Sequence, residues 1–135
     1  MKQLYHLLCP VDFSAASYEA IEKAGFLAQL FQADLTLLHV VKVPVSFGVD
    51  YGMDEQSEVL TQKAARHARL LLREAKRAYI PYAVKCKSSI RFGQPAREIL
   101  REVKQLKADL LIWGMESGGE GDELFAHLCE DLHIP

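Results

Sequence analysis

The residues best suited to chemistry lie in the turn Asp12-Phe13-Ser14, directly after an apolar run that ends at Pro10. Proline cannot donate to a strand ladder, so the strand is predicted to finish near Pro10 and to leave Asp12 in the turn, where any ligand would be bound. The Asp12 carboxylate, which accepts hydrogen bonds only, would equally satisfy amides at the start of a helix capped by Ser14. Both interpretations select the same residue, and the sequence leaves them open.

A second group of chemically active residues follows Gly114 and is strongly acidic. No lysine or arginine follows Gly114, while carboxylates crowd the glycine-containing segment (Glu116, Glu120, Asp122 and Glu123). Such a cluster repels phosphate at short range. His127, Cys129 and His133 lack a fourth ligand and match no zinc-finger spacing, so no metal site is predicted. A short amphipathic helix from Asp122 to Leu132 is expected instead.

The elements that position these residues alternate between strand and helix. An apolar stripe predicts a helix from Ser14 to Gln32, in which Gly25 is explained by close packing on the sheet. A loop is expected from Lys42 to Met53. Strands are predicted over Leu7–Val11, Leu35–Val41, Ala83–Arg91 and Leu110–Trp113, and further helices over Asp54–Ala78 and Ala96–Leu106. A helix between two buried strands makes a right-handed crossover, the unit of a parallel sheet.

The strand patterns differ in their expected burial. The other predicted strands are apolar without alternation and are expected to be buried on both faces. The segment Ala83–Arg91 alternates, with Ser88 on the buried face and Arg91 on the outer face, which indicates a half-exposed edge strand. The helix Ala96–Leu106 is expected to bury Ile99, Leu100, Val103 and Leu106.

Composition indicates one ordinary globular domain over residues 1–135. The chain is 50% hydrophobic and 25% charged, and its net charge of -2 gives no bulk attraction to nucleic acid or anionic lipid. No apolar run approaches the roughly 20 residues that span a bilayer, and no signal-peptide pattern is present. Cys9, Cys86 and Cys129 form an odd set and are interpreted as free thiols in a reducing cytoplasm. The basic face of the helix Asp54–Ala78 is interpreted as solvated.

Four segments, in order, resemble the universal stress protein family: Leu8–Ser14, Ala33–Val41, Gly93–Leu100 and Ala108–Gly114. The resemblance implies a doubly wound, Rossmann-like α/β fold with helices on both faces of an open parallel sheet. The family's strand order is 3-2-1-4-5. This chain ends at His133-Ile134-Pro135, so an order of 3-2-1-4 with the fifth strand missing or truncated is expected. The family also implies a homodimer, whose contact is predicted to include Leu110–Trp113 or the C-terminal segment.

The ATP-binding branch of the family places base and ribose against the first turn, the end of the second strand and the glycine after the fourth. Carried over, this implies contacts from Pro10, Val11, Asp12, Val40 and Gly114, with Asp12 accepting from an adenine amino group or a ribose hydroxyl. The phosphate end departs from the family pattern. Ser117 stands at its second glycine position and His127 at its third.

Three classes of function follow from these observations. The preferred one is a cytoplasmic stress-response protein that acts through dimerisation and protein contacts, without enzymatic activity, cofactor, nucleic acid or membrane, and with a degenerate nucleotide site. The alternative is a stress protein that binds ATP or AMP in the crevice of Asp12, Val40 and Gly114. An enzyme on the same fold is disfavoured, because no nucleophile–base spacing stands out.

Overall fold

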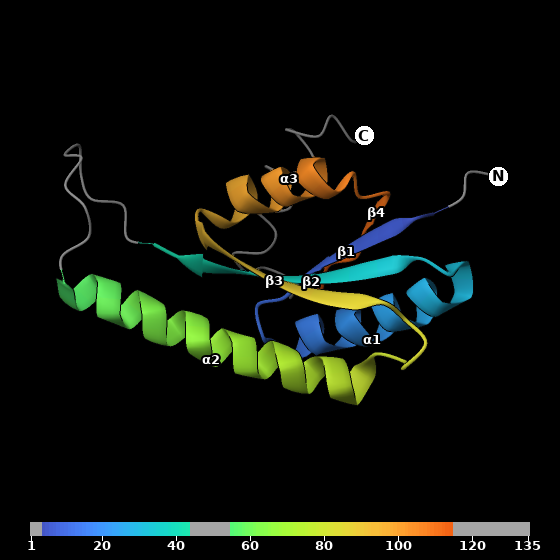
Figure 1. Ribbon diagram of the computed structural model, residues 1–135, viewed down its shortest axis with the longest axis horizontal. Coiled ribbons are helices and arrows are strands. Elements are labelled where there is room, and N and C mark those ends of the chain that lie inside the picture. Colours follow the sequence, from blue (N-terminus) through green and yellow to red (C-terminus); the bar gives the residue numbers. More distant parts are fainter. Residues whose placement is uncertain (1–3, 44–54, 115–135) are drawn as a thin grey trace.

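The computed structural model describes residues 4–43 and 55–114, in which strands and helices alternate as predicted. The carboxyl ends of the strands therefore share one edge of the sheet, and Figure 1 shows that edge facing the start of α1 and α2. The elements are β1 (His6–Pro10), α1 (Ala15–Phe31), β2 (Asp34–Lys42), α2 (Glu55–Tyr79), β3 (Cys86–Gly93), α3 (Pro95–Leu106) and β4 (Leu110–Leu111).

The strands form one parallel sheet in the order β3-β2-β1-β4. Leu7 of β1 aligns with Leu35 of β2 on one side and with Leu110 of β4 on the other. Helices α1 and α2 cover one face and α3 the other (Figure 1). The predicted doubly wound α/β fold and its order 3-2-1-4 are confirmed. The prediction about a fifth strand concerns residues outside the described part of the chain.

Two hydrophobic cores lie on opposite faces of the sheet because successive strand residues point in opposite directions. Leu37 belongs to the larger core, which β1 and β2 form with α1 and α2. Leu38, its neighbour in sequence, belongs to a smaller core with Leu8 and Ile99 under α3. None of the helices in the described ranges is long and apolar enough to cross a membrane.

Helix α1 begins where the sequence predicts, because Ser14 caps it. The Ser14 hydroxyl oxygen accepts a hydrogen bond from the Ser17 amide at 3.1 Å. The close packing expected at Gly25 is present, but its partner was predicted wrongly. A Cβ there would lie 3.0 Å from Ile80 Cδ1 and 3.1 Å from the Tyr79 carbonyl oxygen. Gly25 therefore lets α1 approach the end of α2 rather than the sheet.

The structure corrects the two outer strands of the described sheet. Strand β3 starts at Cys86 instead of Ala83, because Val84 lies in a turn and its amide donates to the Pro81 carbonyl oxygen at 3.0 Å. Ser88, expected on the buried face, is exposed, whereas Arg91, expected outside, is half-buried under α3. Strand β4 has two residues rather than four, and Leu110 at its start is exposed.

Helix α3 also differs from its prediction. It starts at Pro95, one residue early, with proline in the first turn as the sequence suggests. Ile99 is buried, and Val103 and Leu106 pack against the smaller core, but Leu100 does not join it. Two carboxylates, Glu98 and Glu102, are buried on the same helix, each 5% exposed.

Candidate functional site

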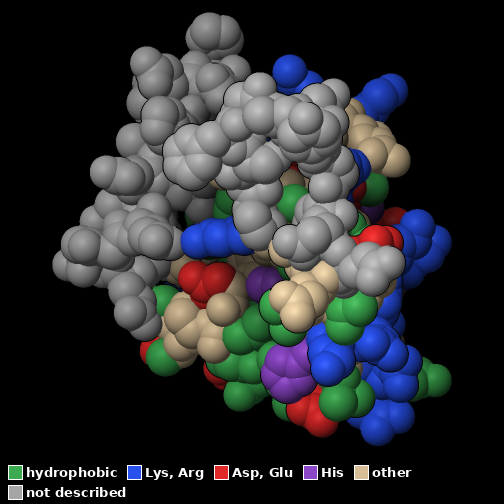
Figure 2. Space-filling view, turned by 90° about the vertical axis from the view of Figure 1, so that its left-hand side faces the viewer, with side chains coloured by type: hydrophobic (Ala, Val, Ile, Leu, Met, Phe, Trp, Pro, Cys, Tyr) green, Lys and Arg blue, Asp and Glu red, His purple; other side chains and the backbone are tan. Residues whose placement is uncertain are grey.

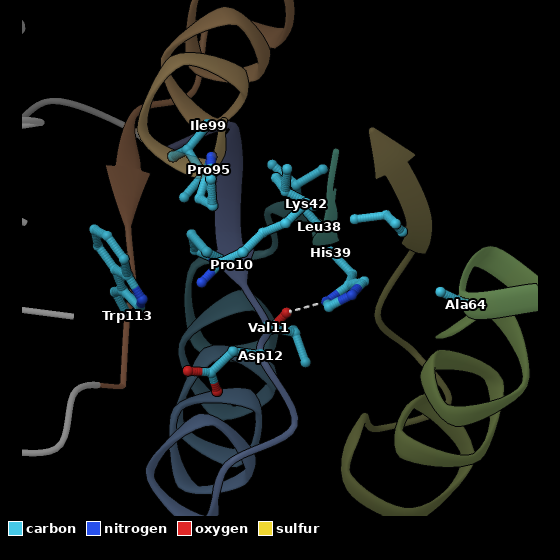
Figure 3. A pocket seen from close by; sticks show the side chains of 12 residues that line it. Pro10, Val11, Asp12, Leu38, His39, Lys42, Ala64, Pro95, Ile99 and Trp113 are labelled. Carbon is cyan, nitrogen blue, oxygen red and sulfur yellow. Dashed lines mark hydrogen bonds between the residues drawn. The ribbon is translucent and has the colours of Figure 1, made fainter. Parts of the chain in front are cut away.

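A pocket of about 470 Å³ lies at the carboxyl ends of β1 and β2, where strand order reverses between β2, β1 and β4. This is the position at which open α/β sheets bind ligands. The start of α3, one residue of α2 and the segment after β4 complete its wall (Figure 3). Its lining consists of Pro10, Val11, Asp12, Leu38, His39, Val40, Val41, Lys42, Ala64, Pro95, Ile99 and Trp113.

The turn between β1 and α1 holds Asp12 at the rim of this pocket. One carboxylate oxygen, Oδ1, accepts from the Ser14 amide at 2.9 Å and from the Ser14 hydroxyl at 2.6 Å. The Asp12 amide donates to the Ser17 hydroxyl oxygen at 3.1 Å. The capping role that the sequence left open for Asp12 is therefore present, and it uses Oδ1. The carboxylate is nevertheless exposed at the pocket, so the same residue can also meet a ligand.

Phe13 carries the unusual backbone of the turn, with φ at 64° in the left-handed region. This conformation is disfavoured for a residue with a bulky side chain, so the surrounding contacts must hold it. Its ring lies 4.7 Å from the His39 ring and 6.5 Å from the Tyr18 ring, measured between centroids. The strained turn is thus fixed from both α1 and β2.

His39 joins the two strands at the floor of the site. Its Nδ1 donates to the Val11 carbonyl oxygen at 2.7 Å (Figure 3). The Val11 amide in turn donates to the Leu38 carbonyl oxygen at 2.7 Å. Because a carbonyl can only accept, the Nδ1 of His39 carries the proton in this contact. The hydrogen bond extends the β1–β2 pairing past Pro10, which itself has no amide proton to offer.

Gly114 has a packing role that explains why the position is glycine. A Cβ at Gly114 would lie 2.0 Å from the Ala16 carbonyl oxygen and 2.8 Å from the Ser17 amide nitrogen. The backbone after β4 therefore rests directly on the first turn of α1. Gly114 does not line the pocket, so the structure brings together Pro10, Val11, Asp12 and Val40 from the predicted set. Ser117 lies outside the described residues.

The pocket offers mainly apolar walls with few polar groups. Pro10, Val40 and Trp113 are among the residues that can contact a flat ring, while Asp12, His39 and Lys42 supply charge or hydrogen bonds at its edge. Within residues 4–43 and 55–114, no group of three His, Cys, Asp or Glu side chains is placed to hold a metal ion. The group of His127, Cys129 and His133 considered from sequence falls outside these ranges.

A model of the universal stress protein family matches residues 5–130. This chain belongs to that family. The Universal stress protein MJ0531 of Methanocaldococcus jannaschii is 27% identical over 108 residues, which cover 80% of this chain and 62% of that protein. The chain thus spans less than two thirds of the length of this curated relative.

Solved structures of the universal stress protein fold superpose on most of the chain. Universal stress protein UspA from Lactobacillus plantarum has 26% identity and a TM-score of 0.79, covering 94% of this chain and 93% of that one. A universal stress protein family protein from Arabidopsis thaliana, solved with AMP bound, has 18% identity and a TM-score of 0.60, covering 93% of this chain and 86% of that one. At 18% identity, the likeness to the Arabidopsis protein shows a shared fold.

Sequence reasoning missed several residues that line the pocket of this universal stress protein. His39 and Lys42 lie on β2, Ile99 and Pro95 come from α3, and Trp113 follows β4. His39 carried a signal, because it is the one ionisable side chain within the apolar run Leu35–Val41. Ile99 carried none, since its spacing marks it only as a core position of α3.

Proposed function

We propose that this universal stress protein is a non-enzymatic regulator in the cytoplasm that acts through self-association and contacts with other proteins. We include in the proposal that its nucleotide site is degenerate at the phosphate end. Two buried free thiols, Cys9 and Cys86, accord with a reducing compartment. The family supplies the link to the stress response.

One observation carries the proposal: two of the groups expected to hold a nucleotide, Asp12 Oδ1 and Gly114, are engaged by the fold itself. Asp12 Oδ1 accepts from Ser14 in the helix cap, at 2.9 Å and 2.6 Å. Gly114, whose lack of a side chain would admit a ligand, is instead in contact with the first turn of α1. The sequence after it adds carboxylates and no cation. These features favour protein contacts over triphosphate binding.

Self-association is expected at β4, the strand that ends the described sheet on that side. Among the described strands β4 pairs with β1 alone, and Leu110 is 36% exposed. Burial of apolar surface there contributes about 25 cal/mol per Å², from which the entropic cost of association is subtracted. A second copy of the chain supplies the matching apolar edge by symmetry.

Sedimentation equilibrium at micromolar concentration tests this dimer. The wild-type chain should sediment as a dimer, and Leu110→Glu should be a monomer, because a carboxylate would be buried in the contact. Leu70→Glu is the matched control, since Leu70 is 50% exposed on α2, a helix that packs against β2 and β3 and not against β4. It should leave the dimer intact. A wild-type monomer contradicts the proposal.

The pocket itself favours a second candidate function, the binding of an adenine nucleoside or AMP. Its volume of about 470 Å³ and its apolar walls suit a base and ribose. The Arabidopsis neighbour with AMP bound has the same fold. In this candidate the ring packs on Pro10 and Val40, and Asp12 accepts from an amino or hydroxyl group.

Calorimetry with magnesium ATP, AMP and adenosine near neutral pH separates the two candidates. The main proposal predicts no ATP binding in the low micromolar range, which corresponds to about -8 kcal/mol. AMP binding that weakens in Asp12→Ala but persists in Ser14→Ala would favour the second candidate. Ser14→Ala is the matched control because it weakens the same helix cap and leaves the carboxylate in place.

A further inference from the structure

A groove of about 560 Å³ runs between α2 and β3, on the far side of the sheet from β4. Arg69, Arg73 and Lys76 line it from α2, and Lys87 lines it from β3. The spacing of the three α2 residues places them on one face of the helix. Cys86, Ser88 and Ile90 of β3 complete the lining, which contains no carboxylate. Figure 2 shows Lys and Arg side chains gathered on the side of the molecule where α2 and β3 lie.

The charge of this groove is not compensated within the described part of the chain. The ion pairs recorded around β3 and α3 join Arg91 of β3 and Arg101 of α3 to carboxylates of α3, and none of the four cations of the groove takes part in them. Arg69, Arg73, Lys76 and Lys87 are all exposed. Like charges at helical spacing repel one another. An anionic partner would relieve that repulsion.

The backbone of β3 presents a second binding feature beside these cations. β3 pairs with β2 on one side only among the described strands, and the Leu35 amide of β2 donates to the Lys85 carbonyl oxygen at 3.0 Å. Because successive residues of a strand direct their amides and carbonyls to alternate sides, Cys86, Ser88 and Ile90 direct theirs away from β2. An unpaired edge of this kind accepts an added strand.

We propose that the groove between α2 and β3 binds an extended acidic segment of a partner protein, added to the sheet as a strand beside β3 with its carboxylates against Arg69, Arg73 and Lys76. This inference rests on the proposed function, since it gives the chemistry of one of the protein partners. It uses the opposite edge of the sheet from the β4 dimer contact.

The dimensions of helix and strand match in this arrangement. Alternate residues of an extended strand lie about 6.7 Å apart. Residues four apart on a helix, such as Arg69 and Arg73, rise by about 6 Å along its axis. Acidic residues at every second position of the bound strand therefore meet successive cations of α2. Lys87 on the edge strand disfavours the addition of neutral or basic strands. The cations of the groove therefore select for acidic strands.

Nucleic acid is the less suitable occupant of this groove. No aromatic side chain lines it, so bases have no stacking platform there. The net charge of -2 provides no general attraction to a polyanion. The unpaired backbone groups of β3 are satisfied by a peptide backbone, whose amides and carbonyls alternate in the same way.

Fluorescence anisotropy with the full chain and a labelled peptide of alternating Glu and Val tests the proposal. The peptide should bind, and its counterpart with Gln for Glu should bind at least about tenfold more weakly. Arg69→Glu with Arg73→Glu should weaken binding by at least about tenfold. The matched control is Lys63→Glu with Arg66→Glu, the same charge change on exposed residues of α2 that do not line the groove. It should change binding by less than about twofold.

A backbone substitution tests the added strand separately from the charge. Ser88→Pro removes an amide that points away from β2, so the β2–β3 ladder keeps its hydrogen bonds and the variant should fold. It should weaken peptide binding by at least about fivefold at unchanged charge. Hydrogen exchange in the wild-type chain provides a second measurement, because the amides of Cys86, Ser88 and Ile90 should be protected when the peptide binds.

Three outcomes would overturn the inference. One is equal binding of the Glu and Gln peptides. Another is peptide binding that protects none of the three β3 amides. The third is a labelled oligothymidylate that binds the wild-type chain more tightly than the acidic peptide does and whose binding is lost in the Arg69→Glu, Arg73→Glu variant. Sedimentation of the same variants distinguishes a failure of this inference from a failure of the proposed function. These variants do not change the contact at β4, so they should remain dimers even if the peptide does not bind.

Discussion

The two strands that end the described sheet, β3 and β4, differ in length and in composition. β3 has eight residues and carries charged and polar side chains along its exposed edge. β4 has two residues, both leucine. A long charged edge discourages uncontrolled pairing, whereas a short apolar edge invites a specific apolar contact. The difference suits two kinds of partner, an acidic segment at β3 and a second copy of the chain at β4.

The two strands are also secured in different ways. β3 is tied to α3 by side-chain charge, because Arg91 pairs with Glu102 at 2.8 Å and with Glu98 at 3.5 Å. β4 is tied by contacts with the backbone. The Asp109 carboxylate accepts from the amides of Tyr5 and His6 at 2.8 Å and 2.9 Å, and Gly114 rests on α1. Side-chain ion pairs therefore contribute most to holding β3 in the fold, and backbone contacts contribute most to holding β4.

The largest effect is expected from Arg91→Ala at the β3 edge. The change leaves Glu98 and Glu102 buried without their shared cation, which should lower the free energy of unfolding by about 3 kcal/mol. Urea unfolding followed by circular dichroism measures it. Arg101→Ala is the control, since Arg101 pairs with Glu98 at 2.8 Å but is 60% exposed. It should cost at most about 1 kcal/mol. If the two variants lose the same free energy of unfolding, the burial of Arg91 with Glu98 and Glu102 does not add to stability.

The next largest effect is expected at the β4 side from Gly114→Ala. The added Cβ would lie 2.0 Å from the Ala16 carbonyl oxygen, a backbone atom that cannot move alone. Overpacking of this kind should lower the free energy of unfolding by about 1–3 kcal/mol. Gly25→Ala provides the same chemical change within α1, where contacts of 3.0–3.1 Å are offset by the gain of about 1 kcal/mol in helix propensity.

Thermal unfolding of the two glycine variants should therefore separate them clearly. Gly25→Ala should change the midpoint little, and Gly114→Ala should lower it. A stable Gly114→Ala protein with an unchanged midpoint would show that the segment after β4 does not rest on α1. In that case the glycine would again need a different explanation, such as access for a ligand.

A smaller effect is expected from Ser14→Ala, at the cap of α1, the helix on whose first turn Gly114 rests. Ser14 caps α1 through the Ser17 amide and also donates to Asp12 Oδ1. Loss of the cap should lower the free energy of unfolding by about 1 kcal/mol. Ser14→Thr is the matched control, because its hydroxyl keeps both an acceptor for the Ser17 amide and a donor for Asp12 Oδ1. If both variants lose the same stability in urea unfolding, the cap is not the source of the effect.

Much of the fold was predictable from sequence because the apolar periodicities directly encode burial. The alternation of elements and the strand order needed only the crossover rule and the family resemblance. The position of Asp12 followed from Pro10, which cannot continue the ladder. Four of the predicted contacts, Pro10, Val11, Asp12 and Val40, line one pocket, since they lie at the carboxyl ends of adjacent strands.

The remaining features depend on partners that are distant in sequence. Arg91, Glu98 and Glu102 each match a solvated position, and only their mutual approach under α3 permits their burial. The short β4 was missed because composition predicts burial but not the number of paired residues. Gly114 matched a ligand-binding motif, yet its contact with Ala16 depends on how α1 lies against the end of β4.

The effect that is smallest near neutral pH concerns the two thiols, one at the edge of the sheet and one at its centre. Burial raises the pKa of Cys9 from its ordinary value of 9.0 to about 12, and the neighbouring Cys86 adds to the rise. Burial raises the pKa of Cys86 to about 11, and Lys76 in the groove opposes that rise. The folded chain therefore keeps both protons at pH values where the unfolded chain loses them.

This difference makes stability depend on alkaline pH with a definite sign. Because the folded state binds more protons above pH 9.0, the contribution of each thiol is complete below that pH and is lost as pH rises toward about 11 for Cys86 and about 12 for Cys9. Urea unfolding between these values should show a falling free energy of unfolding. Cys86→Ala should make the decrease between pH 9.0 and about 11 shallower than in the wild-type chain.

Thiol labelling tests whether Cys86, on the edge strand β3, is more accessible than Cys9 on β1. The experiment uses a Cys129→Ser variant, in which Cys9 and Cys86 are the remaining thiols. Thiolate is the reactive form, and the lower pKa of Cys86 beside Lys76 gives it the larger thiolate fraction. An aromatic disulfide reagent at pH 8 should therefore modify Cys86 first and Cys9 more slowly, both far more slowly than in the unfolded chain. Cys9 lies in β1, between β2 and β4, where no edge admits the reagent. Faster labelling of Cys9 would mean that the β4 side opens before the β3 side, the reverse of what the position of Cys86 in the groove beside Lys76 predicts.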